Sequence, residues 1–278
     1  MPALPLRPHT LVEALDILAR PALVQVTVGG PPLLIQPHAL LMDVGRISEM
    51  AGIHRLGGEL VVGVNSSWAG LMRSSLLHPG AACLTDAAAL MEAEQPGGAL
   101  LHALDATHPH NPILLALAAL DAQIELAVRE SPQRVIRQTL SVQNALQSAP
   151  QAPHLPLSVH FSLPLLATGS ALYRESELSP LQPDAWAAAA VVSLDPAHGR
   201  IARARLALTS PESWPLLCSS VAALQGQEPK KEAVEAVVRL AQRNYPQPRA
   251  STPQFSLVLS SHLIRETLDR AIARSQST

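Results

Sequence analysis

Residues 23–64, LVQVTVGGPPLLIQPHALLMDVGRISEMAGIHRLGGELVVGV, hold the pattern that decides the fold. A β-branched run at 23–28 stops at Gly-Gly-Pro-Pro, residues 29–32, so the sequence predicts a strand followed by a sharp turn. Residues 40–44 predict a second short strand, and residues 47–50 a short helical turn. Gly57 and Gly58 separate two further runs and predict a β-hairpin. This stretch is therefore expected to combine strands with helical turns.

Helix and strand patterns continue on both sides of this stretch. Thr10 can cap a helix over 11–20, because its hydroxyl can accept a backbone N–H of the first turn. Apolar periodicity predicts further helices at 66–72, 85–91, 113–120, 233–243 and 261–274. Strands are expected at 124–128 and 135–138 as a second hairpin, at 157–163 and at 202–209, with an apolar segment at 185–194. The fold class is therefore α+β.

The polar, Pro-rich residues 147–153 have the composition of a surface linker. They predict a boundary between an N-terminal domain, 1–150, and a smaller C-terminal α+β domain, 151–278. The N-terminal domain is expected to contain two subdomains, about 1–55 and 56–150.

Composition excludes several classes of protein. Of the 278 residues, 47% are hydrophobic and only 15% are charged, which argues against both a disordered chain and a membrane-spanning one. A net charge of −2, without a run of basic residues, argues against nucleic-acid binding. Cys83 and Cys218 lie too far apart in sequence to hold an iron–sulfur cluster within this chain. The N-terminus lacks a signal-peptide pattern, so a cytoplasmic location is expected.

Two glycine pairs are the first candidates for a binding site. Gly29-Gly30 follows a predicted strand and would let backbone N–H groups approach a phosphate, although Pro31 and Pro32 have no N–H, and a tight turn is the alternative. Gly97-Gly98 is a second such position, for which an ordinary loop is again the alternative. Two glycine pairs, each at the end of a sheet element, are what a dinucleotide between two subdomains would require.

The remaining candidates are weaker. The cluster His102, Asp105, His108 and His110 offers metal-ligand chemistry, but its spacing matches no known motif, and we predict a solvated loop there and no metal site. Tyr173-Arg174 could line a cofactor or could lie on an exposed strand. Neither cysteine has a histidine nearby in sequence, and a G-x-S-x-G motif is absent, so no catalytic residue is predicted.

The order of these motifs resembles one known family. The resemblance is carried by these segments, in chain order: the run from VQVTVGGPP to GVNSSWAGLMRS, then QPGGALLHALDATHPHNPILLALAALDAQIEL, then LSVHFSLP, GSALYRESE and AAAAVVSLDPAHGRIARARLALTS. Together they are similar to the flavin-binding medium subunit of molybdenum hydroxylases, whose familiar members are carbon monoxide dehydrogenase and xanthine dehydrogenase. Its most specific part is 42–53, MDVGRISEMAGI, which resembles the family's D-I-G-R-I-P-E-L-x-G-I. The likeness covers about residues 10 to 275.

The resemblance implies a bipartite FAD-binding domain of two α/β subdomains, followed by a smaller C-terminal α+β domain with an antiparallel sheet and helices. It implies an oxidoreductase subunit that passes electrons from an iron–sulfur subunit through FAD to an external acceptor. The 2Fe–2S clusters and the molybdopterin would lie on a small and a large partner subunit. The residues it assigns to FAD are Val28, Gly29, Gly30, Pro31, Pro32, Leu33, Gly97, Gly98, Ala99, Asp105, Tyr173 and Arg174.

Both glycine loops depart from the family pattern. Pro31 and Pro32 replace hydroxyl or amide donors in the first loop, and Ala99 replaces an asparagine in a shortened second loop. The alternative is therefore a flavin-free scaffold subunit of the same fold, which assembles the molybdenum and iron–sulfur subunits. A stand-alone binding protein of another fold is the third interpretation.

Overall fold

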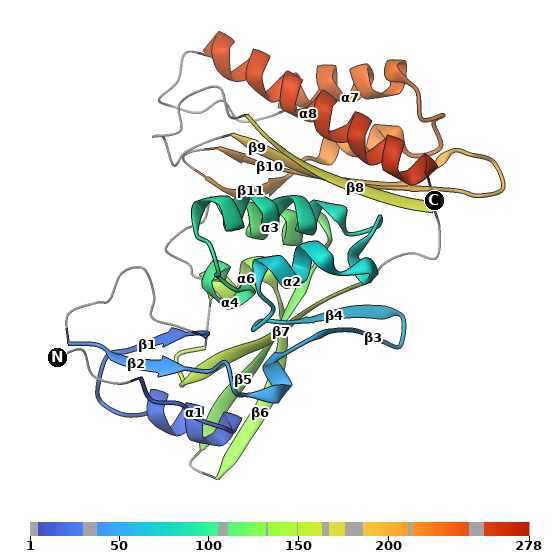
Figure 1. The fold of residues 1–278 in the computed structure, drawn as a ribbon. Coiled ribbons are helices and arrows are strands. Elements are labelled where there is room, and N and C mark those ends of the chain that lie inside the picture. Colours follow the sequence, from blue (N-terminus) through green and yellow to red (C-terminus); the bar gives the residue numbers. More distant parts are fainter. Residues whose placement is uncertain are drawn as a thin grey trace.

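The described part of the chain forms three sheets, with helices packed on their faces (Figure 1). The computed structural model describes residues 5–29, 38–104, 111–131, 133–148, 150–162, 167–175, 186–210, 213–244 and 253–277. The helices are α1 (Leu11–Leu18), α2 (Trp68–Arg73), α3 (Ala82–Glu94), α4 (Leu100–Ala103), α5 (Pro112–Ala119), α6 (Val142–Gln147), α7 (Lys231–Asn244) and α8 (Pro253–Gln276), with 3-10 turns η1 (Ser48–Met50), η2 (Ser75–Leu77) and η3 (Ser219–Leu224). The strands are β1 (Val24–Thr27), β2 (Leu40–Asp43), β3 (Ile53–Leu56), β4 (Glu59–Gly63), β5 (Gln123–Ser131), β6 (Arg134–Ser141), β7 (His154–Ser162), β8 (Ala167–Arg174), β9 (Ala187–Leu194), β10 (Ile201–Ser210) and β11 (Ser213–Leu217).

The N-terminal unit consists of α1, the parallel pair β1–β2 and η1. Helix α1 begins after Thr10, whose hydroxyl accepts the N–H of Glu13, as the sequence predicts. The apolar side of α1 packs with Met42, Val44 and Met50 against residues of β5 and β7. This unit therefore covers part of one face of the next sheet.

The second sheet has five antiparallel strands in the order β3-β4-β7-β5-β6. The hairpin at Gly57 and Gly58 joins β3 to β4, and the second predicted hairpin is β5–β6. Strand β7, which the sequence places after the predicted linker, lies between β4 and β5. The change from one sheet to the next therefore comes after Ser162, whereas the division into domains at residue 150 stays a prediction.

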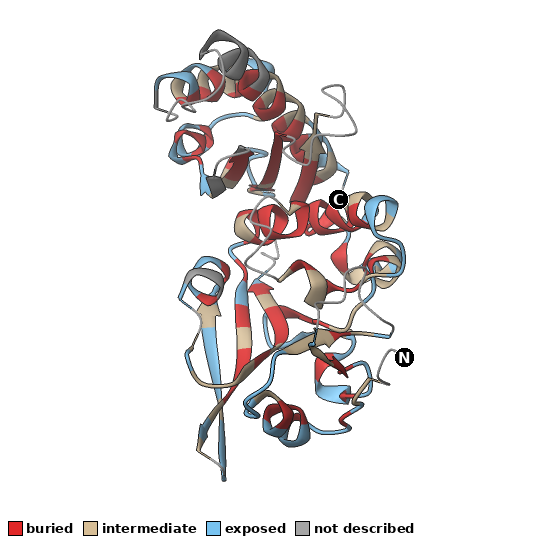
Figure 2. Ribbon diagram, turned by 90° about the vertical axis from the view of Figure 1, so that its left-hand side faces the viewer, coloured by how far each residue is buried: buried red, intermediate tan, exposed pale blue. Residues whose placement is uncertain are grey.

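Alternation along these strands produces the central core. Val62, Val159 and Ile124 lie opposite one another in register and are buried against the helices α2, α3 and α5. The burial colours show α3 as a buried layer between this sheet and the C-terminal one (Figure 2).

The third sheet is antiparallel, in the order β11-β10-β9-β8. One face, which includes Ala171, packs on α7 and α8, and the other, which includes Leu172, packs on the helices of the central core. Gly169 allows β8 to approach α8 closely, because a methyl group there would lie under 3.0 Å from Ala271 O and Ser275 N. The C-terminal sheet is thus covered on both faces, and the whole has the mixed α+β character that the sequence predicts.

Helix and strand predictions agree with the structure in type, with shifted ends. The C-terminal helix begins at Pro253, earlier than the predicted residue 261, and the segment 185–194 forms β9. The sequence predicts a strand at β8 only as an alternative for Tyr173-Arg174, and it does not predict β11, α4 or α6. Within the described part of the chain, no helix combines the length and apolar character that crossing a membrane requires.

Candidate cofactor site

The structure describes part of the predicted site. Of the residues assigned to FAD, it describes Val28, Gly29, Gly97, Gly98, Ala99, Tyr173 and Arg174. The others lie outside the described residues: Gly30, Pro31, Pro32, Leu33 and Asp105. The histidines His108 and His110 of the predicted solvated loop also lie outside them.

Gly29, the described residue of the first glycine pair, is bonded to the carboxylate of Asp43. The backbone N–H of Gly29, just after β1, donates to Asp43 Oδ1 at 3.0 Å, and the N–H of Gly45 donates to the same oxygen at 3.0 Å. Arg7 approaches the other oxygen, with its Nε 3.7 Å from Oδ2. Gly29 has a φ of +69°, a conformation that favours glycine. Asp43 therefore ties the end of β1 to the segment that follows β2.

The second loop, after α3, is closed in the same way. The N–H of Gly97 donates to Glu92 Oε2 at 3.2 Å, and the N–H of Gly98 donates to the Gln95 carbonyl at 3.3 Å. The N–H of Ala99 donates to His102 Nδ1 at 3.2 Å. All three amides are therefore used inside the chain.

His102 is held as a neutral imidazole. Burial lowers the pKa of its side chain below the ordinary value of 6.5, because the charged form loses hydration. Since Nδ1 accepts the Ala99 N–H, the ring proton belongs on Nε2. Nε2 is buried and has no hydrogen-bond partner among the described residues.

Trp68 explains the second glycine of this loop. Its side chain is fully buried, and a methyl group at Gly98 would lie under 3.0 Å from the indole Nε1. The Trp68 N–H donates to the Gly98 carbonyl at 3.1 Å. Gly98 is therefore required by packing against the ring, and it covers an indole N–H that lacks a partner among the described residues.

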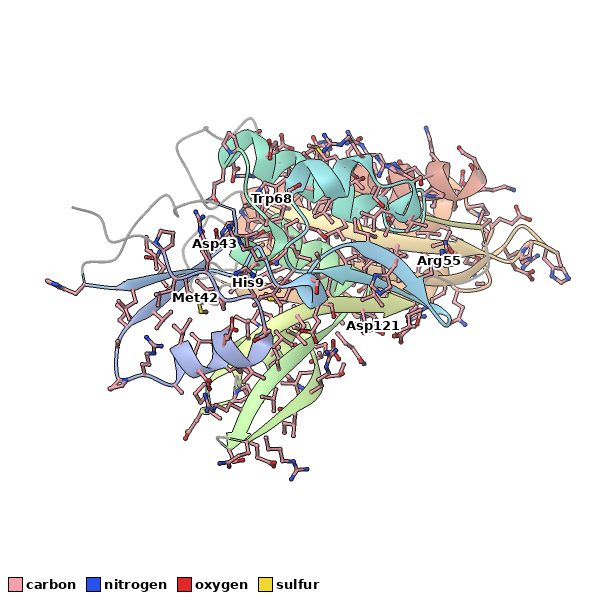
Figure 3. All side chains as sticks on the ribbon, turned by 60° about the horizontal axis from the view of Figure 1, so that its bottom comes forward. His9, Met42, Asp43, Arg55, Trp68 and Asp121 are labelled. Atoms are coloured by element: carbon pink, nitrogen blue, oxygen red, sulfur yellow. The ribbon has the colours of Figure 1, made fainter. Side chains whose placement is uncertain are left out.

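The segment around residue 65 brings the two loops together. Asn65 Nδ2 donates to the Val44 carbonyl at 2.9 Å, and the Leu101 N–H donates to the Val64 carbonyl at 2.8 Å. Asp43 and Trp68 accordingly lie on the same side of the molecule, away from Arg55 and Asp121 (Figure 3).

Tyr173 and Arg174 diverge, because neighbouring residues of a strand point to opposite faces. Arg174 forms an ion pair with Glu94, in the last turn of α3. Tyr173 lies on the α8 side, where the guanidinium carbon of Arg270 lies 4.6 Å from its ring centroid and His262 meets it edge-on at 5.7 Å. The structure thus brings Arg174, and not Tyr173, to the helix that leads into the second glycine loop.

The described residues do not fit the pyrophosphate of FAD. A phosphate at a glycine loop needs free backbone N–H groups and a positive local field. Here the described amides of Gly29, Gly97, Gly98 and Ala99 already donate to acceptors within the chain. The carboxylates of Asp43 and Glu92 bring negative charge to the Gly29 and Gly97 amides, and Glu94 pairs with the nearby Arg174.

Sequence reasoning identified the glycines and missed these three carboxylates. One signal was available for two of them. Glu92 and Glu94 lie in the last turn of α3, where the helix dipole disfavours negative charge. Acidic residues at that position indicate a local partner, which the structure identifies as the Gly97 N–H and Arg174.

Other sites were sought elsewhere in the described residues. None of the described His, Cys, Asp and Glu side chains form a group of three or more that could hold a metal ion. A cavity of about 230 Å³ lies between the end of the five-stranded sheet and β9–β10, and no residue assigned to FAD lines it. Its arginines are compensated, because Arg203 and Arg205 both pair with Asp121, at 3.5 and 2.7 Å.

The similarity of this chain to known proteins was found in its structure alone. No protein-family model matches the sequence, and no curated protein matches it by sequence. A chain of carbon monoxide dehydrogenase from Hydrogenophaga pseudoflava, in a form lacking the Mo-pyranopterin moiety of its cofactor, superposes with a TM-score of 0.79 and 21% identity, over 97% of this chain and 96% of that one. A chain of quinoline 2-oxidoreductase from Pseudomonas putida 86 gives 0.78 and 20%, over 99% and 98%.

A third solved structure agrees with these two. A chain of reconstituted CO dehydrogenase from Oligotropha carboxidovorans superposes with a TM-score of 0.76 and 20% identity, over 99% of both chains. At such low identity the likeness concerns the fold. This chain therefore has, over nearly its whole length, the fold of a chain found in carbon monoxide dehydrogenase and quinoline 2-oxidoreductase.

Proposed function

We propose that this chain is the medium-type subunit of a molybdenum hydroxylase complex and that it acts there as a scaffold for a large molybdopterin subunit and a small iron–sulfur subunit. The observation that carries the proposal is the match in fold over 96–99% of both chains with chains of two kinds of enzyme, CO dehydrogenase and quinoline 2-oxidoreductase. The scaffold version is favoured over an electron-carrying one because the described amides of both glycine loops donate inside the chain.

A second candidate keeps the electron-transfer role, in which FAD on this chain links the iron–sulfur subunit to an external acceptor. Two observations favour it. Gly29 and Gly97 both have positive φ values, +69° and +75°, as sharp glycine turns require. His102 Nε2 is a buried donor without a partner among the described residues.

Co-expression with the two candidate partners tests the subunit role. We expect a stable complex in size-exclusion chromatography that contains this chain, molybdenum and 2Fe–2S clusters. The proposal is wrong if the large and small subunits form the active enzyme without this chain and this chain elutes alone. A requirement for this chain in assembly, without a requirement in electron transfer from the clusters to an acceptor, would favour the scaffold over the second candidate.

A further inference from the structure

We propose that the described residues of the two glycine loops, Gly29 and 97–99, form a closed brace, backed by carboxylates, that excludes FAD and other diphosphate ligands. The brace consists of the bonds Gly29–Asp43, Gly97–Glu92 and Ala99–His102, together with the ion pair Arg174–Glu94. The inference deepens the proposed function, on which it rests for its biological meaning, but flavin binding can be measured on this chain independently of assembly.

The described amides of the two loops already donate hydrogen bonds within the chain. A bound pyrophosphate must receive hydrogen bonds that replace those it loses from water. The Gly29 and Gly97 N–H groups instead donate to carboxylates at 3.0 and 3.2 Å, and charge-assisted bonds of this kind are stronger than neutral ones. Opening them for a ligand would take the Gly97 N–H from Glu92 and would take from Asp43 one of its two backbone donors, since the Gly45 N–H stays.

Negative charge beside both loops also disfavours a phosphate. Each loop has a carboxylate within hydrogen-bond distance of the glycine that would contact phosphate. Like charges repel, and the repulsion grows as a ligand displaces water between them. The arginines that approach these groups, Arg7 and Arg174, are each paired with one of the carboxylates.

The glycines themselves need no ligand to explain them. Gly29 and Gly97 have positive φ values, and Gly98 leaves room for the buried indole of Trp68. His102 Nε2 is a buried, neutral donor without a partner among the described residues, whereas the carboxylates of Asp43 and Glu92 each accept a glycine N–H.

Flavin content and FAD titration of the full chain test the inference. The chain is purified alone and with its partners, and flavin is measured after acid extraction. The chain alone is then titrated with FAD, up to about 100 µM, by fluorescence quenching; this concentration would reveal any Kd in or below that range. We expect less than about one flavin per ten chains and no saturable quenching. Stoichiometric flavin, or saturable 1:1 binding, would overturn it.

Hydrogen exchange of the glycine amides measures the brace directly. The chain has 14 glycines, so selective ¹⁵N-glycine labelling gives a simple spectrum. We expect Glu92→Gln to speed hydrogen exchange at Gly97 about tenfold, through loss of the charge-assisted bond. Glu130→Gln is the matched control, because Glu130 pairs with Arg134 on the β5–β6 hairpin, and it should leave Gly97 unchanged. Unchanged exchange in Glu92→Gln, or saturable shifts of glycine signals on adding inorganic pyrophosphate to the wild type, would contradict the brace.

These results separate the inference from the proposed function. A complex that assembles without flavin supports both. A complex that assembles with one FAD on this chain overturns the brace and the preference for the scaffold version but leaves the subunit role standing, and a flavin-free chain that never assembles overturns only the subunit role.

Discussion

At the residue scale, Gly98 shows that side-chain packing alone can require a glycine that sequence reasoning assigns to a binding loop. A methyl group at this position would lie under 3.0 Å from the indole of Trp68, which is fully buried. We therefore expect Gly98→Ala to lower the free energy of unfolding by about 1–3 kcal/mol, as overpacking does in other cores. Urea denaturation measures the change. Gly58→Ala is the control, since nothing lies within 4 Å of a methyl group there; equal losses in the two variants would refute the packing explanation.

His102 makes stability depend on pH. Its pKa is below 6.5 in the folded chain because burial disfavours the imidazolium. The unfolded chain therefore binds more protons than the folded chain as the pH falls below about 6.5, so the stabilising effect is complete above that pH and is lost on acidification. NMR titration should give a pKa below 6.5, and His102→Gln should lose less stability than the wild type between about pH 7.5 and 5.5. A His102 pKa at or above 6.5 would contradict this.

The candidate site also shows what a sequence can predict about single residues. Glycine turns were predictable, because a positive φ after a strand or helix favours glycine. Their partners were not, because Asp43 reaches Gly29 only once β1 and β2 have paired. The opposite directions of Tyr173 and Arg174 follow from strand alternation, which applies only once 167–174 is known to be a strand.

Among elements, the contact between α3 and the C-terminal sheet includes an ion pair with several further bonds. Asp86 on α3 accepts two bonds from Arg274 of α8, at 2.7 and 3.0 Å, and a third from the Leu172 N–H at 3.0 Å. Arg274 also donates to the Ser170 carbonyl at 2.7 Å. Three elements, α3, β8 and α8, therefore meet at this carboxylate.

Removing the Asp86 carboxylate should weaken the contact among α3, β8 and α8 and lower the stability of the fold. We expect Asp86→Ala to cost about 2–3 kcal/mol, because a half-buried guanidinium loses its paired carboxylate and the Leu172 N–H loses its acceptor. Glu266→Ala removes a carboxylate 3.7 Å from Arg270 on the same α8 helix and should change stability by less than about 0.5 kcal/mol. Thermal unfolding of both variants checks the contrast, and similar costs would show that Asp86 is no more than another surface charge.

At the scale of the whole molecule, the sequence predicted the class of fold better than its topology. The hairpins β3–β4 and β5–β6 were predictable from turn residues and alternation, which are local. The position of β7 between them was not, because alternation identifies a strand without identifying its neighbours. Composition suggested a linker at 147–153, yet the chain returns there to complete the sheet of the first half.

Truncation tests that topology directly. A chain of residues 1–150 keeps both hairpins and lacks β7, the strand that pairs with β4 on one side and β5 on the other. Since an isolated hairpin is marginal in water, we expect this fragment to unfold without a cooperative transition. Residues 1–166 restore β7 and should regain strand signal in circular dichroism and a cooperative melt, at a lower temperature than the full chain because the outer side of α3 and α5 stays uncovered. If 1–150 instead melts as cooperatively as 1–166, the first half folds without β7 and the predicted boundary at residue 150 marks a real domain.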